Sequence, residues 1–171
     1  MELVLDDTLD RAVRELWKIL RVAGLRSLDN HRHPSNRPHI TLAVAASLES
    51  LPVLRLPVPV RLGPACMLGR ALARSADSPE LRDLHAEVWT SLDATNPLHA
   101  PEVWAPHVSL ALNLPDDQRA DALALLAGIP DSFGEAVAIR SYDTVTRTVT
   151  DYGDLPAVRG RGRPATATQM P

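Results

Sequence analysis

Apolar residues in the first part of the chain recur with the spacing of an amphipathic helix. Val13, Leu16 and Leu20 are three and four residues apart, which places their side chains on one face of a helix. Gly24 follows this stripe, and glycine is common just beyond the last turn of a helix. The pattern predicts a helix over Thr8–Val22 that is preceded by a strand.

The same helical stripe recurs 68 residues later, in Leu81, Leu84 and Val88. This offset also superposes two hexapeptides, Pro-His-Ile-Thr-Leu-Ala at Pro38–Ala43 and Pro-His-Val-Ser-Leu-Ala at Pro106–Ala111. A single short match can arise by chance, but a matched helical stripe in the same register makes chance a poor explanation. The sequence therefore predicts an internal duplication in which each half reads strand, helix, loop and Pro-His strand.

Shorter signals predict the remaining elements. Gly128 and Pro130 end a predicted helix over residues 115–127, and residues 47–51 leave room for little more than one turn before Pro52. Strands are predicted over residues 56–62, 137–142 and 148–152, and the last two would form a hairpin.

These elements predict an α+β fold with antiparallel sheets and with helices on the outer faces. Because the two halves match, we expect two pseudo-symmetric lobes that line a central groove. Residues 1–155 are predicted to form this one domain. The tail from Pro156 to Pro171 has no apolar pattern, so we expect it to be disordered.

Composition narrows the class of protein. Apolar residues make up 45% of the 171 residues, which is enough to build a core without disulfides. The single cysteine, Cys66, has no partner within the chain. No apolar run is long enough for a transmembrane helix, and the first residues lack the basic and apolar regions of a signal peptide. These features favour a cytoplasmic protein without a membrane partner.

The charge distribution is uneven. A net charge of −3 argues against a protein that coats nucleic acid, which would be strongly basic. Between Ser50 and Ala76, however, there are four arginines and no acidic residue. Such a run is either a solvated face or a local attraction for phosphate, which the planar arginine fork can hold through two oxygens. Arg70 and Arg74 are the best candidates for the second role.

Strand periodicity sorts the residues of the two Pro-His segments into two faces. One face carries large apolar residues and is predicted to lie in the core: Ile40, Leu42 and Val44, then Val108, Leu110 and Leu112. The other face carries an imidazole, a hydroxyl and a methyl group in the same order: His39, Thr41 and Ala43, then His107, Ser109 and Ala111. If the halves pair about a two-fold axis, the polar faces meet as the walls of a groove that the small alanines leave open.

Two imidazoles that face each other suit phosphodiester chemistry. Histidine titrates near neutral pH, so one imidazole can act as a base while its partner acts as an acid. Attack at phosphorus needs both, and the hydroxyls of Thr41 and Ser109 can donate hydrogen bonds to the non-bridging oxygens. A lone histidine is more often structural, but the repeated pattern favours a catalytic pair, His39 and His107. This chemistry requires no metal.

Other histidines and aromatic residues have alternative interpretations. His31 and His33 lie in a polar loop without cysteine or carboxylate ligands at metal-site spacing. We therefore expect surface histidines, with no metal and no other cofactor. Trp104 and Tyr142 are candidates for stacking on a base, although core packing explains them at least as well.

At His39-Ile40-Thr41-Leu42 and His107-Val108-Ser109-Leu110 the chain resembles the two-histidine (2H) phosphoesterase superfamily, in particular its 2′-5′ RNA ligase and cyclic phosphodiesterase branch. That family is defined by two His-x-Thr/Ser motifs, each followed by an apolar residue. Trp104 and the Val58–Pro64 stretch are also similar, and the likeness covers roughly residues 1–152. The chain departs from longer members in its nearly absent helix after the first motif, and this shortening bears on the shape of one groove wall and hence on the size of the substrate.

The resemblance implies a bilobal fold with a central groove and two histidines as general acid and general base. It favours His39 as the acid and His107 as the base. It also implies substrates such as RNA ends or nucleotides with a 2′,3′-cyclic phosphate, which open to 2′-phosphates. Some members act on 2′-5′ linkages, and 2′-5′ ligation is the reverse of that reaction.

Two functions of different classes follow. The first is a metal-independent phosphoesterase that opens 2′,3′-cyclic phosphodiesters with His39 and His107, while Thr41 and Ser109 bind the phosphate. The alternative is a binding module that holds an RNA end or a nucleotide in the same groove without turnover. No obligatory protein partner is evident. A metal-dependent phosphoesterase is disfavoured because the carboxylate ligands are missing.

Overall fold

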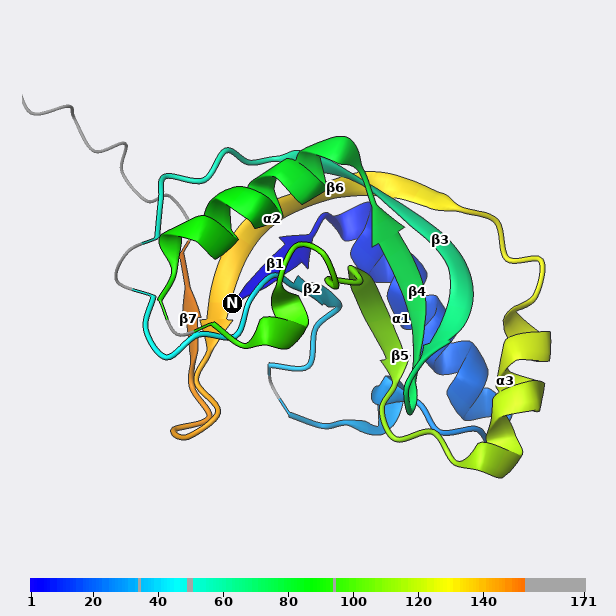
Figure 1. Cartoon of the computed structure of the whole chain (residues 1–171). Coiled ribbons are helices and arrows are strands. Elements are labelled where there is room, and N and C mark those ends of the chain that lie inside the picture. The colour runs from blue at the N-terminus through cyan, green and yellow to red at the C-terminus, as the bar shows by residue number, and fades with distance from the viewer. Residues whose placement is uncertain (34, 49–50, 94, 153–171) are drawn as a thin grey trace, which may run out of the picture.

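The computed structural model describes residues 1–33, 35–48, 51–93 and 95–152. The helices are α1 (Asp7–Val22), α2 (Pro79–Ser91) and α3 (Arg119–Leu126), with short 3-10 turns η1 (Leu28–Asn30), η2 (Pro97–His99) and η3 (Asp116–Gln118) (Figure 1). The strands are β1 (Glu2–Leu5), β2 (His39–Thr41), β3 (Val58–Leu68), β4 (Ala71–Asp77), β5 (His107–Ala111), β6 (Ser132–Tyr142) and β7 (Val149–Asp151). The predicted tail and part of the predicted turn at residues 47–51 lie outside the described residues.

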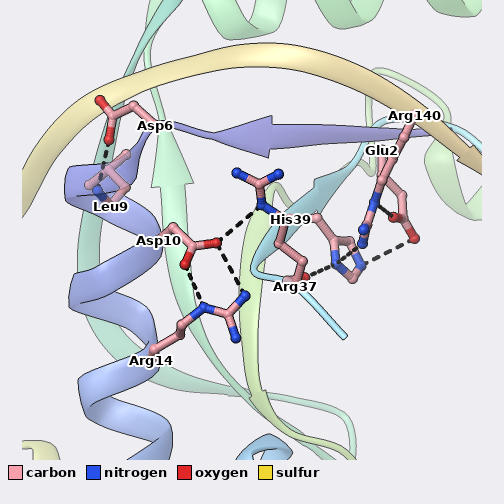
Figure 2. Close-up of polar contacts among 8 residues, drawn as sticks. All are labelled: Glu2, Asp6, Leu9, Asp10, Arg14, Arg37, His39 and Arg140. Atoms are coloured by element: carbon pink, nitrogen blue, oxygen red, sulfur yellow. Dashed lines mark hydrogen bonds and ion pairs between the residues drawn. The ribbon is translucent and has the colours of Figure 1, made fainter. Parts of the chain in front are cut away.

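Helix α1 begins one residue before the predicted range and ends at Val22 as predicted. The carboxylate of Asp6 accepts a hydrogen bond from the Leu9 backbone N–H at 2.8 Å (Figure 2), which caps the first turn. The second Asp6 oxygen accepts one from the Glu135 N–H at 2.7 Å and ties the helix to β6. A Cβ at Gly134 would collide with Asp6 and Leu9, so only glycine allows this close approach. The helix ends before Gly24, whose φ is +75°.

The second predicted stripe is also confirmed. Leu81, Leu84 and Val88 of α2 are buried. Ser78 caps this helix by accepting a hydrogen bond from the Leu81 N–H. The helix predicted over residues 115–127 is interrupted instead, because its first turn forms η3 and α3 begins only at Arg119.

Within the described residues, six strands close into a barrel-like antiparallel sheet. Their order is β1-β2-β5-β4-β3-β6, and β6 pairs back onto β1. The long strands β3 and β6 arch over the shorter ones (Figure 1). Strand β7 extends the sheet as the predicted hairpin partner of β6. Helix α1 packs against β5 and β6, and α2 packs against β3. The expected mixture of helices and antiparallel strands is therefore confirmed.

The strand order sets the two Pro-His strands next to each other. Strand β1 pairs with β2, β4 pairs with β5, and β2 pairs with β5. This is the order expected when two strand–helix–strand units meet at their last strands. One sheet runs through both halves, so the two pseudo-symmetric lobes stay a prediction.

Strands β3 and β6 are longer than predicted. Residues 56–62 were expected to form the first of them, but β3 runs on to Leu68 through an irregularity between Leu62 and Ala65. Its first part pairs with β6, and pairing with β4 continues to its end. Strand β6 begins at Ser132 because this early part pairs with β3, a contact that sequence periodicity does not reveal.

None of the helices in the described part of the chain has both the length and the apolar character that crossing a membrane requires.

Candidate active site

The two motif strands are neighbours in one sheet. Ile40 of β2 lies opposite Val108 of β5. Continued by one residue in each direction, this antiparallel register sets His39 opposite Ser109 and Thr41 opposite His107. Opposite residues of an antiparallel pair project from the same face, so the four polar side chains form one compact group. The sequence predicted that the two motif strands form facing walls of a groove. In the structure they are adjacent strands of one sheet and form the floor of the site.

The predicted alternation holds for most of each motif. Ile40, Leu42, Val108 and Leu110 are buried in the core as expected. It fails at the ends of the two segments. Ala43 and Ala111 are fully buried, whereas Val44 and Leu112 are about half exposed: Ala43 0%, Ala111 0%, Val44 49% and Leu112 48%.

The end of β2 shows why the alternation fails. The strand stops at Thr41, and the Leu42 and Ala43 N–H groups both donate to the Met1 carbonyl. The backbone therefore leaves the regular pleat after Thr41. The expectation that the alanines keep a groove open is wrong, since both lie in the core.

All four predicted site residues line one pocket of about 720 Å³. His39, Thr41, His107 and Ser109 contribute its motif side chains. The pocket also includes Tyr142, which was predicted to lie either near the groove or in the core, while Trp104 is buried. This volume falls in the usual range for small-molecule sites. The structure thus brings together the residues that the duplicated motif singled out.

Both histidines are held in the same way. His39 Nδ1 lies 2.7 Å from the Arg37 carbonyl oxygen, and His107 Nδ1 lies 2.8 Å from the Ala105 carbonyl oxygen. A carbonyl can only accept, so in each ring Nδ1 carries the proton and donates it. In the neutral imidazole, Nε2 therefore has a free lone pair. Each ring can take up or release a proton at Nε2 while the backbone fixes its orientation.

Polar side chains of β1 and β6 continue the row of site residues. Glu2 of β1 lies opposite Thr41 on one side and opposite Arg140 of β6 on the other. Arg140 Nε donates to Glu2 Oε2 at 2.7 Å, and His39 Nε2 lies 3.3 Å from Glu2 Oε1 (Figure 2). The Glu2 and Arg140 side chains are only 14% and 7% exposed, so solvent screens this pair weakly.

The surroundings of His39 act on its protonation in opposite directions. Burial lowers the pKa of His39 below its ordinary value, and the nearby Arg140 and His107 lower this pKa further. The Glu2 carboxylate and the hydrogen bond to the Arg37 carbonyl raise it in part. Arg140 also lies 3.4 Å from Nδ1. Since Nδ1 donates to the Arg37 carbonyl, Arg140 acts on the ring as a nearby charge.

Two tryptophans fix the motif strands reciprocally. Trp17 of the first half donates its indole N–H to the Ser109 carbonyl, and Trp104 of the second half donates to the Thr41 carbonyl, both at 3.0 Å. Trp104 also stacks on buried His85, with the rings 3.7 Å apart. Trp17 is 98% buried. Each indole therefore holds the backbone of the hydroxyl residue that the opposite half contributes.

The arginines favoured by the sequence are not at the pocket. Arg74 is 2% exposed, and its guanidinium donates to the carbonyls of Leu62, Gly63 and Pro130 and to the Ser132 hydroxyl. It fills the irregularity of β3 and is a structural residue. Arg70 is exposed in the turn between β3 and β4. Neither arginine lines the pocket, so the prediction that Arg70 or Arg74 binds the phosphate is wrong.

The pocket-lining arginines, which sequence reasoning missed, are Arg37, Arg140 and Arg147. Glu2 was missed as well. Arg140 interrupts the apolar run of a predicted strand, and that signal could have identified it. Glu2 lies in a short segment with no motif, and only its pairing with β2 and β6 reveals its position.

The loop histidines His31 and His33 are exposed, as predicted, and both line the pocket. The described part of the chain holds no group of three or more His, Cys, Asp or Glu side chains that could bind a metal ion.

Comparison with known proteins assigns the sequence to a family. The family model of the 2′-5′ RNA ligase superfamily matches residues 5–140 of the 171-residue chain. No curated protein matches the sequence significantly. The family match spans both motifs and most of the sheet, confirms the resemblance noted from the sequence, and implies a phosphoesterase- or ligase-type activity. The chain belongs to the 2′-5′ RNA ligase superfamily.

Proposed function

We propose that this protein is a metal-independent phosphoesterase that opens 2′,3′-cyclic phosphodiesters of RNA ends or nucleotides. The observation that carries the proposal is the arrangement of His39 and His107. Both rings line one pocket, both donate Nδ1–H to the backbone, and both therefore present Nε2 for proton transfer. Two such groups supply the acid and the base that in-line displacement at phosphorus needs.

The reaction follows from these positions. One neutral imidazole takes a proton from water as the water oxygen forms its bond to phosphorus. The other, in its charged form, gives its Nε2 proton to the 3′-oxygen as the P–O3′ bond breaks, and a 2′-phosphate results. The hydroxyls of Thr41 and Ser109 donate to the non-bridging oxygens and stabilise the charge that develops there. In 2′-5′ ligation a 5′-hydroxyl takes the place of the water, and the two histidines make the same proton transfers.

Within this proposal His39 is the acid and His107 is the base. The Glu2 carboxylate lies 3.3 Å from His39 Nε2 and stabilises the imidazolium form that an acid must have. Burial lowers the pKa of His39, so the ring also releases its proton readily. His107 has no carboxylate neighbour within salt-bridge distance among the described residues, which suits a group that must start neutral.

The direct test is incubation with 2′,3′-cyclic nucleotides in excess chelator, followed by identification of the product. Two histidines can perform both proton transfers, so turnover should survive chelation and should yield the 2′-phosphate. Loss of activity with chelator, restored by a divalent ion, would contradict the two-histidine mechanism. Binding of nucleotide without any turnover would favour the alternative, a binding module that uses the same pocket.

A further inference from the structure

A second hollow of about 460 Å³ adjoins the catalytic pocket. The two share six lining residues: His33, Ser35, Asn36, Arg37, Arg140 and Arg147. The second hollow therefore continues the first along one side. Arg14 of α1 and Asp151 of β7 line only the second hollow.

Arginine dominates the lining of this second hollow. Four guanidinium groups line it, and Asp151 is the only acidic residue among its lining residues. Two further carboxylates pair with these arginines, Asp10 with Arg14 and Arg37, and Glu2 with Arg140. Even with all three carboxylates counted, one positive charge is in excess.

Two arginines keep donors available. Asp10 lies between Arg14 and Arg37 (Figure 2), and Arg37 donates to it through Nε at 3.3 Å. The two terminal nitrogens of Arg37 make no hydrogen bond among the described residues. Arg147 has neither an ion pair nor a side-chain hydrogen bond in the described part of the chain. Free guanidinium nitrogens next to a polar hollow suit the oxygens of a phosphate.

Arg147 is held at the boundary of the two hollows by the turn between β6 and β7. The Asp143 carboxylate accepts hydrogen bonds from the Val145 and Thr146 N–H groups, and the Asp143 N–H donates to the Thr148 carbonyl. Arg147 has φ of +58°, a left-handed conformation that costs a non-glycine residue about 1–2 kcal/mol. Strained residues of this kind cluster at functional sites.

We propose that this hollow is a second phosphate subsite, so the preferred substrate carries a phosphate group in addition to the one that reacts. The inference rests on the proposed function for the identity of the reacting phosphate. Arg147, Arg37 and Arg14 would hold the second phosphate, which is either a monoester on the same nucleoside or the diester that links a neighbouring nucleotide.

Binding experiments test the subsite without turnover. The dissociation constants of adenosine 2′-monophosphate and adenosine 2′,5′-bisphosphate are measured with the wild type, with Arg147→Gln and with Arg70→Gln. Arg70 is the matched control, because it is an exposed arginine in another hairpin turn. The wild type and the control should prefer the bisphosphate, and Arg147→Gln should weaken that preference by about tenfold, the effect of one hydrogen bond to a charged group. Equal affinities in the wild type, or a preference that Arg147→Gln retains, would overturn the subsite.

Turnover separates the two sources of the second phosphate. The values of kcat/KM are compared for adenosine 2′,3′-cyclic phosphate, for its 5′-phosphorylated form and for a dinucleotide that ends in a cyclic phosphate. A higher value for the 5′-phosphorylated form identifies a monoester, and a higher value for the dinucleotide alone identifies a diester. For the preferred form, kcat/KM should fall more steeply as salt is added, because salt screens the attraction between the arginines and the second phosphate.

The two proposals fail in different ways. Equal kcat/KM values for the three compounds would overturn the subsite and leave the proposed function standing. A bisphosphate preference that Arg147→Gln abolishes, without turnover of any cyclic phosphate, would support the subsite and contradict the proposed function.

Discussion

His39 and His107 are held by the same kind of backbone hydrogen bond but differ in their charged neighbours. Each donates Nδ1–H to the carbonyl two residues earlier in the chain, so the two rings have the same tautomer. Only His39 lies between Glu2 and Arg140 (Figure 2). The duplication supplies two similar imidazoles, and the pairing of β1 with β6 makes their surroundings unequal. Unequal surroundings allow one ring to serve as acid while the other serves as base.

Glu2→Gln should lower the pKa of His39 further. The Glu2 carboxylate raises this pKa, whereas burial and Arg140 lower it, so removing the carboxylate leaves only the lowering effects of the charged neighbours. If His39 is the acid, activity is lost as pH rises through its pKa. The alkaline limb of kcat/KM should then move to lower pH, and NMR titration of the His39 ring should move with it.

Glu15→Gln is the control for this shift. Glu15 is an exposed residue of α1, and its Oε2 lies 4.0 Å from Lys18 Nζ. Its substitution should leave the pH profile unchanged. An unchanged or rising His39 pKa in Glu2→Gln would show that Glu2 does not act on this ring.

Thr41→Ala and Ser109→Ala should each lower turnover less than loss of a histidine does. Each removes one hydrogen bond to a charged oxygen, and a loss of about tenfold is expected. Thr41→Ser and Ser109→Thr should retain activity, because the hydroxyl is kept and the two halves already use both residues. If Thr41→Ser or Ser109→Thr loses as much kcat/KM as the corresponding alanine variant, the hydroxyl itself is not what the site requires.

At the scale of elements, the two longer helices, α1 and α2, are specified by local sequence, whereas the strands depend on their partners. The apolar stripes of α1 and α2 are visible in the sequence, and the structure shows that Asp6 and Ser78 cap these helices. The extra length of β3 and β6 comes from pairing with each other and with β4. Arg74 supports this region from within by donating to three carbonyls and one hydroxyl.

Arg74→Gln should therefore destabilise the fold at the irregularity of β3. The shorter side chain leaves several buried acceptors without a donor, and a loss of about 3 kcal/mol in the free energy of unfolding is expected. Arg70→Gln, at an exposed turn position of the adjacent hairpin, should change it by less than about 0.5 kcal/mol. Denaturant unfolding of both variants measures the difference, and equal stabilities would refute the structural role of Arg74.

At the scale of the whole molecule, the duplication predicted which residues line one pocket better than it predicted the sheet. His39, Thr41, His107 and Ser109 were identified because a motif repeated in one register is visible in the sequence. The closure of β6 onto β1 was not, because contacts between distant segments leave no periodic signal. Contacts between distant segments also explain why Arg140 and Glu2 were missed and why Arg74 was wrongly favoured. The pairing of β1 with β2 and with β6 decides which arginine reaches the pocket.

The central claim is that two histidines in one pocket carry the chemistry. The measurement that tests it most directly is kcat/KM for a 2′,3′-cyclic nucleotide with His39→Ala, with His107→Ala and with the double variant. Each single variant should lose at least about 10²-fold, and the double variant should lose little more, because the two rings act as a unit. Both rings are partly exposed at the pocket, so circular dichroism and thermal melting should show folded proteins. Near-parental turnover by either folded single variant would contradict the account.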